Sequence, residues 1–317
     1  MFLYNRVSKK ELRKRVAAET FKRVTLSFYR YVKIDDPQQV RDELFAFWQS
    51  LNVLGRIYIA HEGINAQLSV PEHNFKQFID HLHQHALFAQ VPLKYAIEDD
   101  NKSFFALIMK VKAKIVADGM KEGTFDTENT GKRLDALTFH NMVDDPGTVV
   151  VDMRNNYESE VGRFYNAICP DVKTFRQELP AVLDLLEDKK DKNILLYCTG
   201  GIRCEKASAW LKHNGYEKVF QLDGGIIQYV HEIKKQGLDS KFIGKNFVFD
   251  ERLTERVTAD VLSKCHTCGI VTERQINCMN DPCHTIFIQC ETCAEDRKGC
   301  CSDKCLEEHT QKIAIAR

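Results

Sequence analysis

Apolar and polar positions in the first part of the chain alternate between the strand period and the helix period. Apolar residues recur at helical spacing after Val40 and again after Phe75. Segments rich in β-branched and aromatic residues, typical of strands, come at 24–31, 56–60, 64–70, 92–97 and 104–112. The resulting order β-α-β-β-α-β predicts a ferredoxin-like (acylphosphatase-like) α+β sandwich for residues 1–117.

A glycine-containing stretch poor in apolar residues, 118–131, is expected to be a linker. After it, apolar strand signals at 148–153, 193–198 and 218–225 are separated by helical patterns. This alternation predicts an α/β domain with a parallel sheet over residues 132–240, whose site lies at the carboxyl ends of the strands. The rest of the chain, 241–317, is expected to form a cysteine-rich module.

Composition fits an ordinary globular protein and narrows its possible partners. The 317 residues include 45 Lys+Arg and 45 Asp+Glu, so binding to a polyanion would need locally segregated basic charge. No apolar run approaches the roughly 20 residues that span a bilayer, and the N-terminus lacks the apolar core of a secretory signal. We therefore expect a cytoplasmic protein that does not enter membranes.

The segment from Ile194 to Glu205 places a cysteine between a strand and a helix. Cys198 follows the apolar strand, the loop continues through Thr199, Gly200, Gly201, Ile202 and Arg203, and Cys204 begins the helix. Glycines let backbone N–H groups turn inward, and a helix N-terminus adds positive potential, so this loop favours a thiolate. The alternative is a buried cysteine at a strand end. Cys204 is interpreted either as a thiol that resolves an oxidised Cys198 or as a packed helix residue.

Twelve cysteines are present, and nine of them lie between Cys265 and Cys305. Two C-x2-C pairs separated by 21 residues predict a first metal site with the ligands Cys265, Cys268, Cys290 and Cys293. The intervening and following cysteines predict a second, interleaved site with the ligands Cys278, Cys283, Cys301 and Cys305. We expect structural zinc, because the module has few aliphatic residues to close a core. An iron–sulfur cluster and a metal-free redox reservoir are the alternatives.

The Cys198 loop, CTGGIR, resembles the six-residue active loop of rhodanese domains. The flanking segments VDMRNNYESEVGRF and VFQLDGGIIQY are also similar, although Arg163 stands where the common motif has histidine. Together with HEGINAQLSVP, FIGKNFVFDER and the cysteine pattern, they resemble the bacterial rhodanese-domain tRNA uridine hydroxylases. The resemblance covers nearly the whole chain.

This resemblance implies conversion of uridine 34 in tRNA to 5-hydroxyuridine, with dioxygen as co-substrate and an electron donor that the sequence does not specify. It also implies a persulfide-type catalytic role for Cys198, and recognition of the tRNA anticodon loop, whose unpaired base can enter a pocket. We find no flavin or dinucleotide fingerprint. The alternatives are a rhodanese-type sulfurtransferase and a tRNA- or protein-binding adaptor.

Several side chains outside the loop are candidates for contact with tRNA. The expected phosphate contacts are Lys10, Arg13, Arg163 and Lys206. A nucleotide pocket could also include Tyr58, His61, Glu62 and Asn65, although Glu62 and the following glycine would equally suit a hairpin turn.

Overall fold

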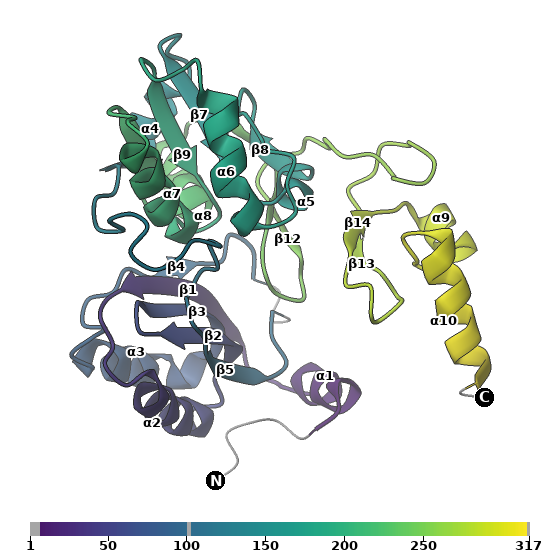
Figure 1. The fold of residues 1–317 in the computed structure, drawn as a ribbon. Coiled ribbons are helices and arrows are strands. Elements are labelled where there is room, and N and C mark those ends of the chain that lie inside the picture. Colours follow the sequence, from purple (N-terminus) through teal and green to yellow (C-terminus); the bar gives the residue numbers. More distant parts are fainter. Residues whose placement is uncertain (1–6, 100–102, 316–317) are drawn as a thin grey trace.

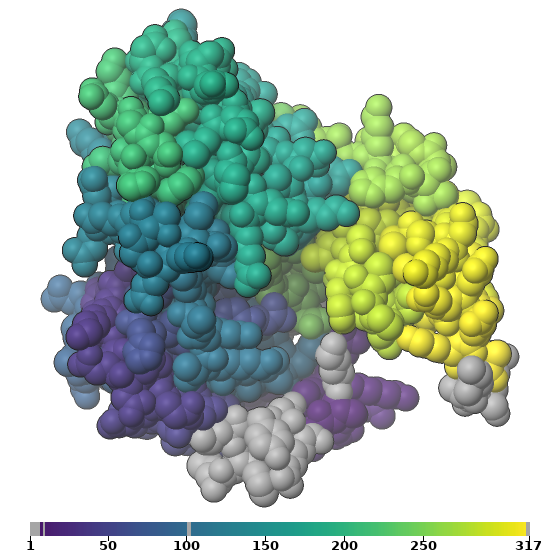
Figure 2. All heavy atoms as spheres, viewed as in Figure 1, coloured from purple at the N-terminus to yellow at the C-terminus, as the bar shows by residue number. Residues whose placement is uncertain are grey.

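A computed structural model describes residues 7–99 and 103–315 of the chain. It contains an N-terminal sandwich, a central α/β unit and a small cysteine-rich module (Figure 1). The module, coloured yellow, lies beside the other two units in the space-filling view (Figure 2). None of the helices in the described ranges is long and apolar enough to cross a membrane.

The N-terminal unit has the predicted ferredoxin-like strand order with one additional edge strand. Its five-stranded sheet has the order β4-β1-β3-β2-β5, with the strands β4 (Lys94–Tyr95), β1 (Arg23–Tyr31), β3 (Gly63–Pro71), β2 (Leu54–Ala60) and β5 (Leu107–Val111). Its helices are α1 (Lys9–Ala17), α2 (Pro37–Ser50), the short 3-10 turn η1 (Glu72–Asn74) and α3 (Phe75–Gln84). All neighbours in the sheet are antiparallel except β2 and β5, which are parallel.

The two faces of this sheet have different environments because side chains alternate along a strand. Leu26 and Phe28 of β1 pack with Trp48 of α2 in the apolar core. Tyr29 and Tyr31 lie on the opposite face and contact the central unit. In Figure 1, α2 and α3 cover the face turned away from the central unit. The sheet therefore offers its polar face to the second domain.

The central unit is built on a four-stranded parallel sheet in the order β6-β10-β9-β7. The strands are β6 (Lys132–Leu134), β7 (Thr148–Asp152), β9 (Asn193–Tyr197) and β10 (Val219–Leu222). The main helices are α4 (Ala136–Met142), α6 (Phe175–Leu186), α7 (Ile202–His213) and α8 (Gly225–Gln236). Two apolar clusters show that α4 and α8 cover one face of the sheet, whereas α6 and α7 cover the other.

A second sheet connects the central unit to the chain that follows it. Its order is β12-β11-β8, and its strands are β8 (Gly162–Phe164), β11 (Phe242–Phe247) and β12 (Thr254–Arg256). The short helix α5 (Asn156–Ser159) precedes β8. Because β11 begins after residue 240, the start of the segment that we assigned to the third unit is hydrogen-bonded to the second.

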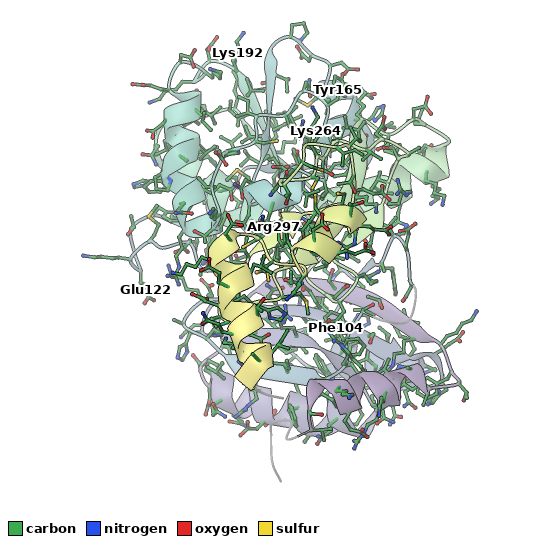
Figure 3. The ribbon with its side chains drawn as sticks, turned by 90° about the vertical axis from the view of Figure 1, so that its right-hand side faces the viewer. Phe104, Glu122, Tyr165, Lys192, Lys264 and Arg297 are labelled. Carbon is green, nitrogen blue, oxygen red and sulfur yellow. The ribbon has the colours of Figure 1, made fainter. Side chains whose placement is uncertain are left out.

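The cysteine-rich module has little regular structure. It consists of the hairpin β13 (Gln275–Asn277) and β14 (Ile286–Ile288), followed by α9 (Glu291–Asp296) and α10 (Asp303–Ile315). Its small core combines cysteines with a few apolar side chains such as Phe287 and Leu306. Figure 3 shows Arg297 near the start of α10, where its guanidinium lies 2.7 Å from the Asp303 carboxylate. Such a core is small for a stable domain, which favours stabilisation by metal.

Candidate active site and metal centres

Cys198 lies directly after β9, at the carboxyl end of a central parallel strand. Gly201 adopts a φ of 95°, a left-handed conformation that favours glycine, and precedes the first residue of α7. Its N–H donates a hydrogen bond to Cys198 Sγ at 3.1 Å. The loop therefore directs backbone donors and the N-terminus of α7 at the sulfur, as the sequence predicts.

This environment favours a thiolate at Cys198. Complete burial of the side chain opposes ionisation, but a hydrogen bond from Cys204, the charge of Arg203 and backbone N–H groups outweigh it and lower the pKa of Cys198 to about 5. Burial and the neighbouring thiolate raise the pKa of Cys204 well above its usual value. Cys204 is therefore a protonated thiol that donates to the Cys198 thiolate. The structure brings the two sulfurs together but does not assign a reaction to Cys204.

Arg203 contributes charge to the loop from within an ion pair. Its guanidinium donates to both carboxylate oxygens of Glu158 at 2.6 and 2.9 Å, and both side chains are buried. Thr199 Oγ1 lies 3.4 Å from the backbone oxygen of Phe247 in β11. Glu158 and Phe247 thus hold the two ends of the loop from outside it. Glu158 belongs to the segment VDMRNNYESEVGRF, which is similar to the flanking segment of rhodanese domains.

A second pair of glycines closes the loop from α8. The N–H of Ile226 donates to the carbonyl oxygen of Cys198 at 3.0 Å. A Cβ on Gly225, whose φ is 66°, would lie only 2.5 Å from that same oxygen. Glycine at this position lets the backbones approach, which explains why the segment LDGG follows the third strand of the unit.

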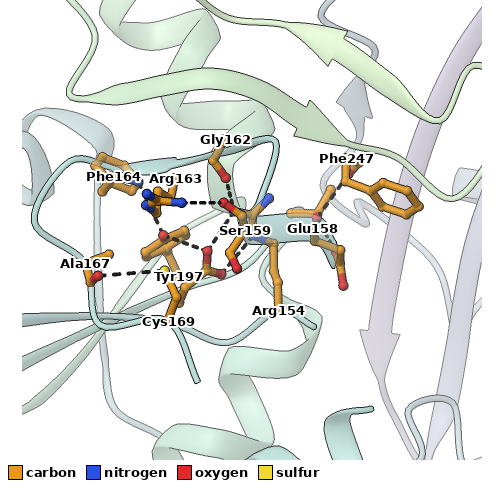
Figure 4. Close-up of polar contacts among 12 residues, drawn as sticks. Arg154, Glu158, Ser159, Gly162, Arg163, Phe164, Ala167, Cys169, Tyr197 and Phe247 are labelled. Carbon is orange, nitrogen blue, oxygen red and sulfur yellow. Dashed lines mark hydrogen bonds and ion pairs between the residues drawn. The ribbon is translucent and has the colours of Figure 1, made fainter. Parts of the chain in front are cut away.

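The flanking Asp-x-Arg pattern has a structural role beneath the loop. Arg154 is fully buried and donates to both oxygens of Asp152, at 2.8 and 2.7 Å, and to the carbonyl of Gly162. Tyr197 donates to Asp152 at 2.8 Å (Figure 4). These contacts join the ends of β7, β8 and β9 immediately before Cys198.

The N-terminal unit reaches the Cys198 loop through its polar sheet face. Tyr29 donates to the buried carboxylate of Glu205 in α7 at 2.8 Å. Tyr31 donates to the carbonyl of Ile202 at 3.3 Å. Lys206 is also buried, and its ammonium lies 2.9 Å from Glu62 and 2.7 Å from Asp118. This burial leaves no free ammonium at Lys206, so it does not fit the expected contact with a tRNA phosphate.

A cavity of about 570 Å³ lies between the two units and opens onto the Cys198 loop. Its size falls in the range of pockets for small organic groups. The N-terminal sheet contributes polar and aromatic side chains, the central unit contributes the loop, and the β11–β12 region contributes Phe249 and its neighbours. The residues that matter most for its chemistry are Tyr29, Tyr58, Asn65, Gln67, Lys94, Cys198 and Arg203.

Only part of the expected nucleotide pocket lines this cavity. Tyr58 and Asn65 are cavity residues and are opposite each other in the register of β2 and β3. Glu62 instead pairs with Lys206, and the His61 ring contacts the carbonyl of Ile34 at 2.9 Å. Tyr29 and Lys94 also line the cavity and were not predicted from the sequence. The alternation of polar residues along β1 was a signal for Tyr29, whereas the two-residue strand β4 gives no signal for Lys94.

The other expected tRNA contacts are distributed over the surface. Lys10 and Arg13 lie on α1, and Arg13 pairs with Glu251 at 3.0 Å while remaining largely exposed. Arg163 donates to the carbonyl of Ser159 at 3.1 Å and lies near Cys169 (Figure 4). It lines a second cavity, of about 820 Å³, and is not among the residues around the cavity at Cys198.

The cysteine-rich module gathers the two sets of four cysteines that the spacing predicts. In each set the sulfur atoms all lie within 4.8 Å of one another, and the twelve cysteines of the chain are free thiols. The first set is Cys265, Cys268, Cys290 and Cys293, and the second is Cys278, Cys283, Cys301 and Cys305. Each set could hold a metal ion.

The sulfur spacing provides a test of that fit. Tetrahedral coordination with metal–sulfur bonds of about 2.3 Å requires sulfur atoms about 3.8 Å apart. The separation is 3.7 Å between Cys268 and Cys290, 3.5 Å between Cys283 and Cys301, and 3.8 Å between Cys301 and Cys305. These three separations are those expected between ligands of a four-thiolate site.

Three family models match consecutive parts of the chain. A UPF0176 acylphosphatase-like domain matches residues 23–115, a rhodanese-like domain matches residues 135–232, and a rhodanese C-terminal domain matches residues 243–306. The first two confirm the predicted classes of the N-terminal and central units.

Curated relatives match almost the entire chain. A tRNA uridine(34) hydroxylase from Leptospira interrogans is 54% identical over 303 residues, covering 96% of this chain and 83% of the relative. A tRNA uridine(34) hydroxylase from Enterobacter sp. (strain 638) is 51% identical over 307 residues, covering 96% of this chain and 88% of the relative. The chain belongs to the tRNA uridine(34) hydroxylase family. Among solved structures, it is similar to a rhodanese-like domain from Anabaena sp., with 20% identity, a TM-score of 0.28, and coverage of 35% of this chain and 78% of that one.

Proposed function

We propose that this protein hydroxylates uridine 34 of tRNA to 5-hydroxyuridine, with dioxygen as co-substrate, so that it is an oxidoreductase. The observation that carries the proposal is the identity of 50% or more with tRNA uridine(34) hydroxylases over 96% of the chain. The aligned region covers nearly the whole chain, so it extends over all three units.

The cavity beside Cys198 supports entry of a nucleobase. Tyr29, Tyr58 and Phe249 supply aromatic surface, and Asn65 and Gln67 supply carboxamides that can pair with a base edge. The base at an anticodon position is unpaired, so placing it in such a cavity requires unstacking but no melting of a duplex. We infer that uridine 34 enters this cavity from the tRNA anticodon loop.

We infer that Cys198 is the catalytic thiolate and the carrier of a persulfide-type sulfur. Its low pKa and the surrounding backbone donors support this role. Arg203 supports it by adding positive charge while Glu158 fixes its position. Cys204 is a candidate resolving thiol: its attack on a Cys198 sulfenic acid would form an S–S bond and release water.

We infer that eight of the nine cysteines of the module bind two structural zinc ions. Thiolate ligands, the tetrahedral spacing of the sulfurs and the small apolar core support zinc in this role. The zinc ions would hold β13, β14, α9 and α10 together, and we assign them no part in the chemistry at Cys198.

Mass analysis of tRNA tests the proposed function directly. We would isolate tRNA from cells that lack the protein, from cells that express it, and from cells that express Cys198→Ala. An added oxygen atom at uridine 34 that requires Cys198 is the expected result. An added sulfur atom would identify a sulfurtransferase, and an unchanged nucleotide in all three samples would favour a binding adaptor.

A further inference from the structure

Lys94 is a buried lysine from the N-terminal unit that faces the Cys198 loop. It is only 6% exposed and lines the cavity shared by the two units. Its Nζ lies 4.6 Å from the centre of the Tyr29 ring. A Cβ placed on Gly200 would be 3.7 Å from Lys94 Cδ, and one placed on Gly224 would be 3.7 Å from Lys94 Cε. The side chain therefore extends across both glycine turns that surround Cys198.

The strand that carries Lys94 is fixed between the domains. Lys94 pairs with Ser27 in the register of β4 and β1. On the other side of β4, the ring of His231 in α8 contacts the carbonyl oxygen of Tyr95 at 3.0 Å. These contacts hold the backbone on both sides of the lysine, so its position depends on the assembled domains.

The amine of Lys94 has no ion-pair or hydrogen-bond partner among the described residues. The nearby carboxylate of Glu205 is already engaged, since it accepts from Tyr29, Arg133 and Gln221. This contrasts with Lys206, whose buried ammonium is matched by two carboxylates. An unpaired buried amine that faces a cavity is costly as a structural element and is suited to chemistry.

The charged and titratable groups that face Lys94 come from five different segments. The pKa of Lys94 is lowered to about 8, chiefly by burial and to a smaller extent by the charge of Arg133 in β6. Asp223 before α8, Cys198 and Glu205 in α7 act in the opposite direction. Tyr29 on β1 contributes its ring face. About one tenth of the amine is therefore neutral at pH 7, and this form can accept a proton.

We propose that Lys94 is the general base that removes the hydrogen at C5 of the uracil ring during hydroxylation. The inference rests on the proposed function and adds a catalytic residue to it. Its position beside Cys198, its unpaired amine and its entry from the domain that forms the rest of the base cavity all support this role.

The proton balance of hydroxylation requires such a base. A peroxide-level oxygen donor, formed from dioxygen by a two-electron reductant, supplies a hydroxyl group. The C5=C6 electron pair forms the C5–O bond, and the O–O bond breaks with its electrons on the departing oxygen, which leaves as an oxyanion and takes a proton from solvent. C5 then carries both the hydroxyl group and its original hydrogen. Lys94 takes that hydrogen as a proton, and the C–H electron pair restores C5=C6. The amine becomes an ammonium, which returns its proton to solvent between turnovers.

The depth of the cavity separates this role from phosphate binding. Lys173 and Arg176 also line the cavity, but their side chains are exposed. Phosphates are strongly hydrated and suit such exposed cations, whereas the buried Lys94 lies with Tyr29, Asn65 and Gln67, which suit a base. A deep lysine and exposed cations at the entrance match a nucleotide that inserts base first.

The test uses the full-length protein and tRNA from cells that lack it. An aerobic extract of those cells supplies the reductant, and 5-hydroxyuridine is measured by mass spectrometry with wild type, Lys94→Gln, Lys94→Arg and the control Lys76→Gln. Lys76 is an exposed lysine on α3, which covers the far face of the sheet. We expect both Lys94 variants to lose about 100-fold or more in rate, because neither side chain can act as the base, and the control to match wild type.

The outcomes distinguish this inference from the proposed function. No hydroxylation by wild type would overturn the function itself. Hydroxylation by wild type together with a Lys94→Arg rate within a few-fold of it would show that positive charge is sufficient, and would overturn the base assignment alone. Alkylation of Cys198 by iodoacetamide, together with thermal melting, shows whether each variant keeps the fold around the loop.

Two further measurements test the proton transfer itself. The wild-type hydroxylation rate should rise with pH through an inflection at about 8. A rate that is flat from about pH 6 to about pH 10 would contradict the proposal. This measurement needs only the wild-type protein, so it does not depend on whether the variants fold. With uridine deuterated at C5, the isotope effect should be larger for Lys94→Gln than for wild type, because proton removal becomes slower. An equal or smaller effect in the variant would overturn the assignment.

Discussion

Tyr29 and Glu205, 176 positions apart in the chain, are joined by a hydrogen bond of 2.8 Å across the boundary between the first two domains. The tyrosine belongs to β1 of the N-terminal sheet, and the glutamate lies one residue after Cys204 in α7. The bond therefore couples the polar face of one sheet to the helix whose N-terminus faces Cys198. The active loop is thus built against a surface from the N-terminal domain.

Removal of this hydrogen bond should weaken the contact between the domains. Tyr29→Phe leaves the ring in place but removes the hydroxyl donor from a buried carboxylate, so we expect the free energy of unfolding to fall by about 1.5–3 kcal/mol. Thermal melting monitored by circular dichroism measures the change. Tyr165→Phe is the matched control, because Tyr165 and its partner Asp144 are exposed and should contribute little. Equal effects of the two substitutions would contradict the interpretation.

The ionisation of Cys198 should determine how its alkylation rate depends on pH. We expect the rate of labelling of Cys198 by iodoacetamide, followed by peptide mass spectrometry, to rise as pH increases through about 5 and to level off above it. Cys204→Ala removes a donor to the thiolate, so the inflection should move to higher pH. Cys169→Ala, away from the loop, should leave it in place. An inflection near the ordinary value for a free thiol in wild type would argue against an activated cysteine.

The metal assignment predicts stoichiometry and stability. Purified protein should contain about two zinc ions per chain, and Cys290→Ser should lose one of them and lower the melting temperature of the module. Cys169→Ser, which lies outside both sets, should retain both ions. Iron in place of zinc, or retention of two ions in Cys290→Ser, would show that the assignment is wrong.

The buried Lys206 should stabilise the fold instead of binding tRNA. Lys206→Met leaves Asp118 with less compensation in a buried position, so we expect a loss of about 3–5 kcal/mol in the free energy of unfolding. Lys76→Met breaks an exposed ion pair and should change stability by less than about 1 kcal/mol. Denaturant titration of both variants provides the comparison.

The Lys206 effect should also depend on pH. Burial opposes ionisation of Asp118, but hydrogen bonds from Lys114 and Lys206 outweigh it and lower its pKa. A lowered carboxyl pKa contributes stability that is present above the unfolded value of about 3.9 and is lost as pH falls through the folded value. The stability difference between wild type and Lys206→Met should therefore narrow in acid. A stability difference between wild type and Lys206→Met that stays constant down to about pH 2 would exclude the Lys206–Asp118 ion pair as its cause.

Basic residues on α1 are the remaining candidates for a tRNA contact at a distance from the loop. Lys10→Glu with Arg13→Glu should weaken tRNA binding and reduce the slope of log affinity against log salt by about 2, without changing the alkylation of Cys198. Filter binding over a range of salt concentrations measures both quantities. Lys76→Glu on α3 is the control. Unchanged affinity in the double variant would remove α1 from the interface.

Features that depend on neighbours along the chain could be predicted from the amino-acid sequence. The strand–loop–helix around Cys198, the two cysteine sets and the helical stripes of the N-terminal unit each follow from local spacing, because turn geometry, ligand bite and amphipathic periodicity act over a few residues. The family resemblance added hydroxylation of uridine to these predictions.

Contacts between side chains that are distant in sequence became evident only from the packing of the domains. Lys206 follows the loop closely in sequence, yet the fold buries it against Glu62 and Asp118. Lys94 lies on a two-residue strand that no periodicity marks, yet the packing of β4 between β1 and α8 brings it to the loop. Whether a charged side chain becomes a surface contact, a buried ion pair or an unpaired amine depends on the burial and partners that domain packing creates, and these are not encoded in local spacing.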